Sequence, residues 1–310
     1  MHVALIANPL AGRRRGLRAA AAAEAVLTAG GWQVATRSTA GPGDATRLAR
    51  EAAEEGCNVV FACGGDGTLS QVVRGLLGTG VPAGLIPCGT GNDFARTISL
   101  PRAPAAAAKQ ALVGHPAEVD LLEVNGGEAW ALNVLGAGFD ARVAERMNRR
   151  CRALPGLAAY LAAVAAELAH CRPTAVRVQV GKETWEGSAL LVAIANATCY
   201  GAGMRIAPEA DIMDGLLDVV LVEHVGRLAF ARAFPRVFRG THTTHPAVHM
   251  WRASDCRVET AEPAPVLVDG DVQLRTPLHV RVAHRRAKLW MPPAPAPVAS
   301  ALRLEPTPEA

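Results

Sequence analysis

The chain has 310 residues, of which 50% are apolar, and it carries a net charge of +4 at pH 7. This length and apolar content suffice for two domains with hydrophobic cores. The mild charge and an aromatic content of 4% exclude a protein that works mainly by stacking on nucleic-acid bases, so we expect no nucleic-acid partner.

The seven cysteines form no CxxC pair, and several lie in apolar runs, which indicates small core residues in a reducing compartment. At the N-terminus the apolar run precedes the charges, which is the wrong order for a signal peptide. No uninterrupted apolar stretch is long enough for a membrane helix. We therefore expect a cytoplasmic protein.

Strands and helices alternate at short spacing in the first part of the chain. Strands are predicted at 2–7, 32–38, 59–63 and 83–87, and helices at 17–29, 44–55, 69–76 and 103–113, with Asp44 as an N-cap. This order predicts a doubly wound parallel sheet. Ligands of such sheets bind beyond the carboxyl ends of the strands, where the glycine-rich turns of this chain should gather.

The turn Gly64-Gly65-Asp66-Gly67-Thr68 lies between a predicted strand and a predicted helix. Glycines let the backbone approach a phosphate, and the amides of a helix start point toward it. No lysine follows, so this is not the common phosphate-binding loop. The acid could orient magnesium, a basic group or a hydroxyl, or it could cap a helix at a tight turn.

A second glycine-rich turn, 89–96, carries Asn92, Asp93 and Arg96. A polar helix start explains one such residue, but it does not explain a repeated acid-bearing turn at the same edge of the sheet. The repetition favours a functional site.

The pattern changes after residue 113. Strands are predicted at 118–124, 128–135, 175–180, 189–196, 217–222 and 257–259, with helices at about 155–170 and 226–239. We therefore predict an α/β domain at 1–125, an antiparallel β-rich domain at 126–291, and a disordered Pro- and Ala-rich tail at 292–310.

Several motifs in this order resemble those of the diacylglycerol kinase catalytic-domain family of soluble bacterial lipid kinases, whose superfamily includes sphingosine and ceramide kinases. They are NPLAG (8–12), GGDGT (64–68), PCGTGNDFAR (87–96), a Gly-rich 133–140 segment, 196–203, an acidic 207–218 segment and VDGD (268–271). The resemblance covers about residues 1–290. It implies an α/β nucleotide-binding domain, a C-terminal antiparallel β-sandwich, and an active site in the cleft between them.

The same resemblance implies that ATP and Mg²⁺ serve to phosphorylate a lipid hydroxyl, with diacylglycerol converted to phosphatidic acid. It assigns nucleotide binding to Asn8, Arg13, Thr39, Gly64, Gly65, Asp66, Gly67, Thr68, Leu69, Ser70, Thr90, Asn92 and Asp93.

The acids divide into three groups by resemblance. Asp66, Asp93 and Asp120 match an acidic network that organises magnesium near the nucleotide, and Asp66 is also a candidate catalytic acid. The late turn supplies the base, either Asp269 or Asp271, where the family usually has Glu at the third position of the turn. Lastly, Asp211, Asp214 and the carbonyl of Leu216 match a magnesium site away from the chemistry, for which the alternative is an acidic turn before a strand.

Three alternatives stay open. The chain could phosphorylate a sphingoid or other lipid, it could phosphorylate a soluble compound such as NAD, or it could bind lipid or nucleotide without catalysis. The form GTGNDFAR favours diacylglycerol by resemblance. Two further motifs are set aside: GAGFDA (136–141) lacks the context of a dinucleotide site, and the spacing of His242, His245 and His249 is better explained by surface histidines before a strand.

The partners follow from the same interpretation. Arginines at 142, 146, 149, 150 and 152, followed by an apolar helix at 157–168, predict peripheral contact with an anionic membrane surface. The alternative is a solvated face beside a core helix. The sequence leaves the assembly open, a homodimer included.

Overall fold

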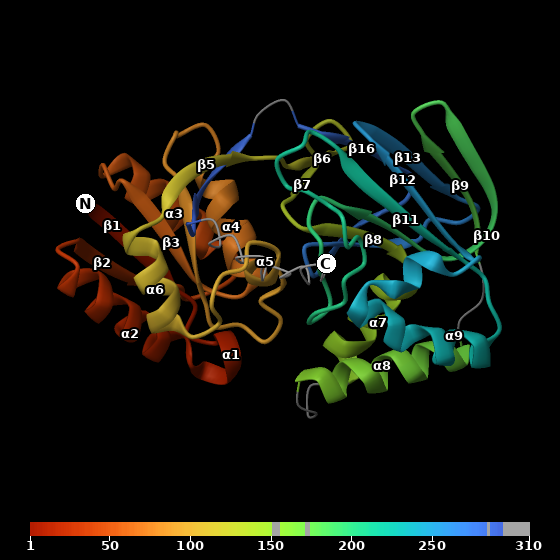
Figure 1. Cartoon of the computed structure of the whole chain (residues 1–310), viewed down its shortest axis with the longest axis horizontal. Coiled ribbons are helices and arrows are strands. Elements are labelled where there is room, and N and C mark those ends of the chain that lie inside the picture. Colours follow the sequence, from red (N-terminus) through yellow and green to blue (C-terminus); the bar gives the residue numbers. More distant parts are fainter. Residues whose placement is uncertain (151–155, 171–173, 284–285, 294–310) are drawn as a thin grey trace, which may run out of the picture.

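The computed structural model describes residues 1–150, 156–170, 174–283 and 286–293. It has two lobes side by side, an α/β lobe and a lobe dominated by antiparallel strands (Figure 1). This confirms the predicted fold class. Among the described residues, no helix is long and apolar enough to cross a membrane.

The first lobe contains a six-stranded sheet in the order β2-β1-β3-β4-β17-β5. Its strands are β1 (His2–Ala7), β2 (Gln33–Ser38), β3 (Val59–Gly64), β4 (Ala83–Pro87), β5 (His115–Val119) and β17 (Ala287–Met291). Strands β1 to β4 pair in parallel. Strands β3 and β4 are buried along their whole length because helices cover both faces of the sheet.

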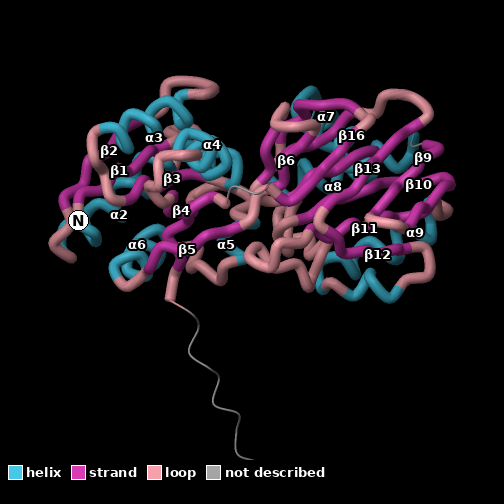
Figure 2. The backbone as a smooth tube through the Cα atoms, turned by 90° about the horizontal axis from the view of Figure 1, so that it is seen from above, coloured by secondary structure: helices cyan, strands magenta, loops and turns pink. Residues whose placement is uncertain are grey.

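Six helices belong to this lobe: α1 (Ala11–Arg14), α2 (Gly16–Ala29), α3 (Asp44–Glu54), α4 (Asp66–Leu76), α5 (Asp93–Thr97) and α6 (Pro104–Leu112). Figure 2 shows α3 and α4 on one face of the sheet and α2 and α6 on the other. Small alanines on α2, among them Ala19, Ala20 and Ala23, are buried against the sheet, which lets helix and strands approach closely.

Two local predictions are wrong. Asp44 is not an N-cap, because Gly43 occupies that position at φ 83°, and the Asp44 carboxylate instead accepts hydrogen bonds from the N–H groups of Ala40 and Gly41. The strand predicted at 118–124 is two strands, which belong to different sheets. Asp120 and Leu121 lie between them, where the chain passes from one lobe to the other.

The second lobe contains an eleven-stranded sheet. Its strands are β6 (Leu122–Val124), β7 (Ala129–Ala131), β8 (Val134–Gly138), β9 (Thr174–Val180), β10 (Glu183–Ala195), β11 (Leu217–Glu223), β12 (Val248–Ala253), β13 (Asp255–Thr260), β14 (Pro265–Val268), β15 (Asp271–Arg275) and β16 (Leu278–Val282). Alternate residues of these strands share one core, which gives the sandwich its interior.

A second core of this lobe lies under helices on one side of the sheet (Figure 1). These are α7 (Phe139–Arg150), α8 (Gly156–His170), α9 (Arg227–Ala233) and the 3₁₀ helices η1 (Phe234–Arg239) and η2 (Thr241–Thr244). The last strand, β17, returns to the first lobe, where it pairs with β4 and β5. It therefore crosses the proposed boundary at residue 125.

Candidate active site

Three glycine-rich segments converge beyond the carboxyl ends of β1, β3 and β4. A Cβ on Gly12, which has φ +56°, would lie 1.9 Å from the Cys88 carbonyl oxygen. A Cβ on Gly89 would lie 2.5 Å from the Cα of Gly65. The carbonyl of Gly64 accepts hydrogen bonds from the N–H groups of Cys88 (2.8 Å) and Gly89 (3.1 Å). Only glycine allows backbones to approach this closely, so the turns form one unit.

Helix α4 begins directly after Gly65, so its first amides have no partner within the helix and face the edge where the turns meet. Asn8, which follows β1, donates its side-chain N–H to the hydroxyl of Thr68 (3.3 Å). Thr39, which follows β2, donates its backbone N–H to the Ala7 carbonyl (2.9 Å). The structure therefore brings the predicted nucleotide residues of these segments to one edge, which offers amides and hydroxyls to a phosphate.

The segment after β1, which includes α1, also supplies cations. Arg13 and Arg14 are exposed and adopt φ of 61° and 64°, in the left-handed region that side chains rarely occupy. Thr90 is exposed on the loop after β4.

Asp66 holds the start of another helix. Its carboxylate accepts hydrogen bonds from the N–H groups of Asp93 (3.1 Å) and Phe94 (2.8 Å), the first residues of α5. This is a capping contact, but it acts across two turns rather than on the helix in which Asp66 lies. It joins the two acid-bearing turns that the sequence predicts to lie together.

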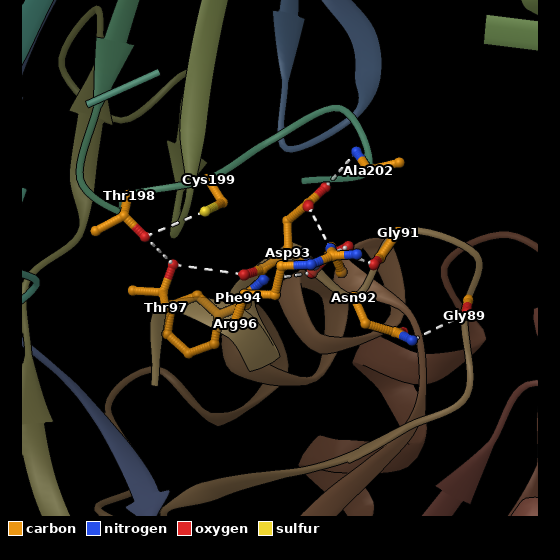
Figure 3. Close-up of polar contacts among 11 residues, drawn as sticks. Gly89, Gly91, Asn92, Asp93, Phe94, Arg96, Thr97, Thr198, Cys199 and Ala202 are labelled. Atoms are coloured by element: carbon orange, nitrogen blue, oxygen red, sulfur yellow. Dashed lines mark hydrogen bonds and ion pairs between the residues drawn. The ribbon is translucent and has the colours of Figure 1, made fainter. Parts of the chain in front are cut away.

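Asp93 joins the two lobes (Figure 3). Its buried carboxylate accepts a hydrogen bond from the Ala202 N–H of the second lobe (2.8 Å) and pairs with the guanidinium of Arg96 (2.8 Å). Burial, with the charge of nearby Asp66, raises the pKa of Asp93 to about 6. A hydroxyl contact between Thr97 and Thr198 (3.1 Å) adds to this junction.

Asn92 shapes the same turn from within. It is buried and adopts φ 52°, and its side-chain N–H donates to the Gly89 carbonyl (3.0 Å). The 89–96 turn is therefore held by side chains as well as by glycines.

The late acidic turn is a two-residue hairpin. Val268 pairs with Asp271, and the central residues Asp269 and Gly270 have φ of 47° and 99°, the positive values that a type I′ turn requires. Asp269 is therefore a central residue of the turn, whereas Asp271 is the first residue of the returning strand β15.

Asp269 is enclosed by donors. Its carboxylate accepts hydrogen bonds from the N–H groups of Leu132 (2.8 Å), Asn133 (2.8 Å) and Val134 (3.3 Å). It also accepts a fourth from the hydroxyl of Ser70 (2.9 Å), which lies in α4. Burial raises the pKa of Asp269, against these four bonds, which lower it. The Ser70 bond joins the hairpin to the helix that follows the first phosphate-type turn.

Asp271 is the exposed first residue of β15. Its carboxylate has no hydrogen bond or ion pair with any residue that the structure describes. Of the two acids in the hairpin, only Asp271 has oxygen lone pairs that no described residue uses.

A different acid group lies at the turn before β11. Asp211 accepts from the Met213 N–H (3.0 Å), and Asp214 accepts from the Leu216 N–H (2.9 Å) and pairs with Arg252 (2.6 Å). Fully buried Asp120 accepts from the N–H of Gly215 in the same turn (2.7 Å). Asp120 therefore makes its contacts at this turn, whereas Asp66 and Asp93 lie together at the glycine-rich edge.

The donor types at this turn suit a hard cation, since two carboxylates and a backbone carbonyl offer only oxygen. Asp120 keeps one buried carboxylate oxygen without a hydrogen bond, with the Arg286 Nε 3.3 Å away. No group of three or more His, Cys, Asp or Glu gathers as a metal cluster within the described part of the chain. The residues fit magnesium as far as donor chemistry goes.

Sequence reasoning missed an apolar cavity of about 70 Å³ in the second lobe. Its walls come from α7, β10, β11, α9, η1 and the 200–206 loop, and include Phe139, Leu191, Phe230, Phe234 and Val237. Phenylalanines at 230, 234 and 238 recur at four-residue spacing, which places them on one helical face and could have indicated this wall.

Two sequence interpretations change here. His242 is buried, not on the surface: one ring nitrogen lies 3.1 Å from the Ile206 carbonyl oxygen, and burial lowers its pKa. Arg142 and Arg146 of α7 both pair with Glu167 of α8, which offsets their charge. The side chains of arginines 149, 150 and 152 lie outside the described residues.

The site thus combines glycine-rich turns and carboxylates at the junction between the lobes, with an apolar cavity in the second lobe. Comparisons with known proteins identify the family. The family model described as the diacylglycerol kinase catalytic domain matches residues 2–124, and the model described as the YegS C-terminal NAD kinase beta sandwich-like domain matches residues 133–290.

The chain is 36% identical over 283 residues to a diacylglycerol kinase of Mycobacterium tuberculosis (strain ATCC 25618 / H37Rv), covering 90% of this chain and 91% of the relative. It is 28% identical over 270 residues to a diacylglycerol kinase of Bacillus subtilis (strain 168), covering 86% and 88%. The crystal structure of a diacylglycerol kinase from Bacillus anthracis str. Sterne shares the fold, with a TM-score of 0.73 and 24% identity over 94% of this chain and 97% of that one.

The chain belongs to the diacylglycerol kinase catalytic-domain family, and it carries that family's YegS-type C-terminal domain. It is thus a lipid kinase. Membership of a kinase family implies ATP as the phosphoryl donor, usually with a divalent metal ion.

Proposed function

We propose that this protein transfers the γ-phosphate of ATP to the free hydroxyl of diacylglycerol, which yields phosphatidic acid. The observation that carries the proposal is the bond between Ser70 and Asp269, residues 199 positions apart. It brings the glycine-rich edge, which offers amides to phosphates, against the hairpin that carries Asp271, whose carboxylate is unpaired among the described residues. Phosphoryl transfer requires these two parts to face each other.

In this proposal the first lobe binds ATP. The residues concerned are Asn8, Arg13, Thr39, Gly64, Gly65, Asp66, Gly67, Thr68, Leu69, Ser70, Thr90, Asn92 and Asp93. Backbone amides and hydroxyls position the phosphates, and Arg13 offsets their charge. Asp66 and Asp93 hold the turns in register through backbone hydrogen bonds.

Asp271 is the base in this proposal. It accepts the proton of the lipid hydroxyl as the oxygen attacks the phosphorus, and it is suited to do so because its carboxylate is exposed and unpaired among the described residues. Asp269 is a positioning residue, since its oxygens already accept four hydrogen bonds.

Magnesium, when bound, would neutralise phosphate charge near Asp66 and Asp93. At the turn before β11 it would be held by Asp211, Asp214 and the Leu216 carbonyl, with Asp120 behind them. The apolar cavity of the second lobe has walls of almost only hydrocarbon and aromatic surface, and at about 70 Å³ it suits a short part of an acyl chain rather than a whole lipid.

The test is transfer from labelled ATP, with magnesium, to a panel of acceptors: diacylglycerol in mixed micelles, sphingosine, ceramide, monoacylglycerol and NAD. Labelled phosphatidic acid is the expected product. Label in another lipid only would replace the substrate and keep the reaction. ATP binding without any labelled product would favour the non-catalytic alternative.

A further inference from the structure

The segment between Glu223 and Asp255 contains no acidic residue, but it contains five arginines: 227, 232, 236, 239 and 252. It forms α9, η1, η2 and β12. In a chain with nearly balanced charge, 32 basic against 28 acidic residues, this is a local excess of one sign.

Helix α9 and the 3₁₀ helix η1 have two unlike faces. The inner face carries Phe230, which stacks on Phe234 at a ring distance of 5.5 Å, and Val237, and all three line the apolar cavity. The outer face, which we call the α9–η1 face, is formed by Arg227, Leu228, Arg232 and Arg239, all exposed. Leu228 is 63% exposed and lies in α9 next to Arg227 and one helical turn before Arg232, so it adds apolar surface to this face.

Within the described part of the chain, no ion pair neutralises the cations of this face. Among the described residues, Arg227, Arg232 and Arg239 have no carboxylate within ion-pair distance. Arg142 and Arg146 differ in this respect, because both pair with Glu167. An ordinary solvated face mixes charges of both signs, whereas this segment exposes arginines and has no acid in its sequence.

We propose that the α9–η1 face docks the protein on an anionic phospholipid bilayer, with Leu228 entering the interface and the arginines contacting headgroup phosphates. The attraction would be mainly electrostatic, since clustered arginines near an anionic leaflet each strengthen binding about fivefold, and Leu228 would add one apolar contact. The cavity lies directly behind this face, so an acyl chain leaving the bilayer would meet Phe230 and Phe234. This inference rests on the proposed function in one respect: the proposed substrate, diacylglycerol, is a membrane lipid.

The test is sedimentation with vesicles of phosphatidylglycerol and phosphatidylcholine, against vesicles of phosphatidylcholine alone. The variant Arg227→Glu/Arg232→Glu/Arg239→Glu should lose about 100-fold or more in partition onto the anionic vesicles, since each cation near such a surface contributes about fivefold. Native protein should bind the zwitterionic vesicles weakly or not at all.

A matched control reverses three exposed cations elsewhere, Arg102→Glu/Lys182→Glu/Arg257→Glu, and should bind as the native chain does. A second pair tests the apolar contact. Leu228→Asp should weaken binding, whereas Val113→Asp should not, although Val113 is equally exposed, at 66%.

Native-level binding by the α9–η1 variant would overturn the proposal, and so would an equal loss in both charge-reversal variants. Retention on duplex DNA in place of vesicles would also overturn it. Phosphoryl transfer to diacylglycerol in non-ionic micelles separates the docking proposal from the proposed function. Micelles of this kind present no anionic surface, so the α9–η1 variant should transfer phosphate as the native chain does. Vesicle binding through this face, with no lipid phosphorylated by any variant, would reject the proposed function and keep the docking surface.

Discussion

Replacing each acid of the hairpin by its amide should separate their roles. Asn at position 269 keeps the shape of Asp but has one acceptor oxygen in place of two. If the amide oxygen faces Asn133 and Val134, the amide nitrogen faces the Leu132 N–H, and that bond is lost. The Ser70 hydroxyl can reverse its role and accept from the amide.

The expected cost of Asp269→Asn follows from these contacts. One lost hydrogen bond to a charged acceptor costs about 1.5–3 kcal/mol, and loss of the charge weakens the two that remain, so we expect about 2–4 kcal/mol in the free energy of unfolding. For a chain of 310 residues that lowers Tm by roughly 3–6 °C. Ser70→Ala removes one of the four hydrogen bonds to Asp269, the one that comes from the first lobe, and should lower the free energy of unfolding by less.

Asp271→Asn should show the opposite pattern. The side chain is exposed and unpaired among the described residues, so the unfolding free energy should change by no more than about 0.5 kcal/mol. The value of kcat should fall about 100-fold or more, because a general base contributes on that order. Asp271→Glu restores a carboxylate and should recover most of the rate.

The assay combines steady-state kinetics on micellar diacylglycerol with thermal unfolding of the same preparations. If Asp271→Asn kept kcat within about threefold while folded Asp269→Asn lost activity, the assignment of the base would be reversed. Equal and small effects on kcat in both variants would place the base outside the hairpin.

Three further predictions concern other contacts. Gly12→Ala should lower the free energy of unfolding by about 1–3 kcal/mol from backbone strain alone. It should also weaken ATP binding, measured by calorimetry, because the new Cβ would meet the Cys88 carbonyl. The control Gly41→Ala, whose Cβ would have no atom within 4 Å, should match the native chain. Burial raises the pKa of Asp140 to about 6, so the stability that this group contributes is present below about pH 4 and is lost as pH rises through 6. The unfolding free energy of Asp140→Asn, measured with urea, should therefore improve relative to the native chain by about 2–3 kcal/mol from pH 4 to 7.5. Finally, chelation of magnesium should lower the native Tm by about 5 °C and leave that of Asp214→Asn unchanged, if the turn before β11 binds the ion.

The first lobe could be predicted from the sequence because its signals are local. Buried parallel strands are continuous apolar runs, and each glycine-rich turn follows its strand directly. The turn at Asp66 shows the limit of this reasoning. Either a cap or a chemical role fits the sequence, and the structure shows a cap for α5, a contact between two separate turns that no local pattern contains.

The second lobe was harder to predict because its elements depend on distant partners. Strands β14, β15 and β16 have only four or five residues each, and β15 begins with an acid, so their periodicity is weak. Strand β17 pairs with β4 and β5, which precede it by more than half of the chain. Such long-range pairing cannot be inferred from a single sequence window.

The acids of the site differ in what their oxygens do, and this difference decides which of them can react. Asp66 and Asp93 each accept backbone hydrogen bonds that fix a turn. Asp269 accepts three from the consecutive backbone N–H groups of residues 132–134, at the start of β8, and a fourth from Ser70 of α4. A carboxylate occupied in this way stabilises the junction between lobes but has few acceptor sites left for the hydroxyl of a substrate, although burial raises the pKa of Asp93 and Asp269. Asp271 lies two residues beyond Asp269 in the same hairpin. The bonds of Asp269 therefore fix the position of Asp271, whose own carboxylate makes none of them. The rigid acid therefore positions the reactive one, and a substitution at either should reveal a different property of the same hairpin.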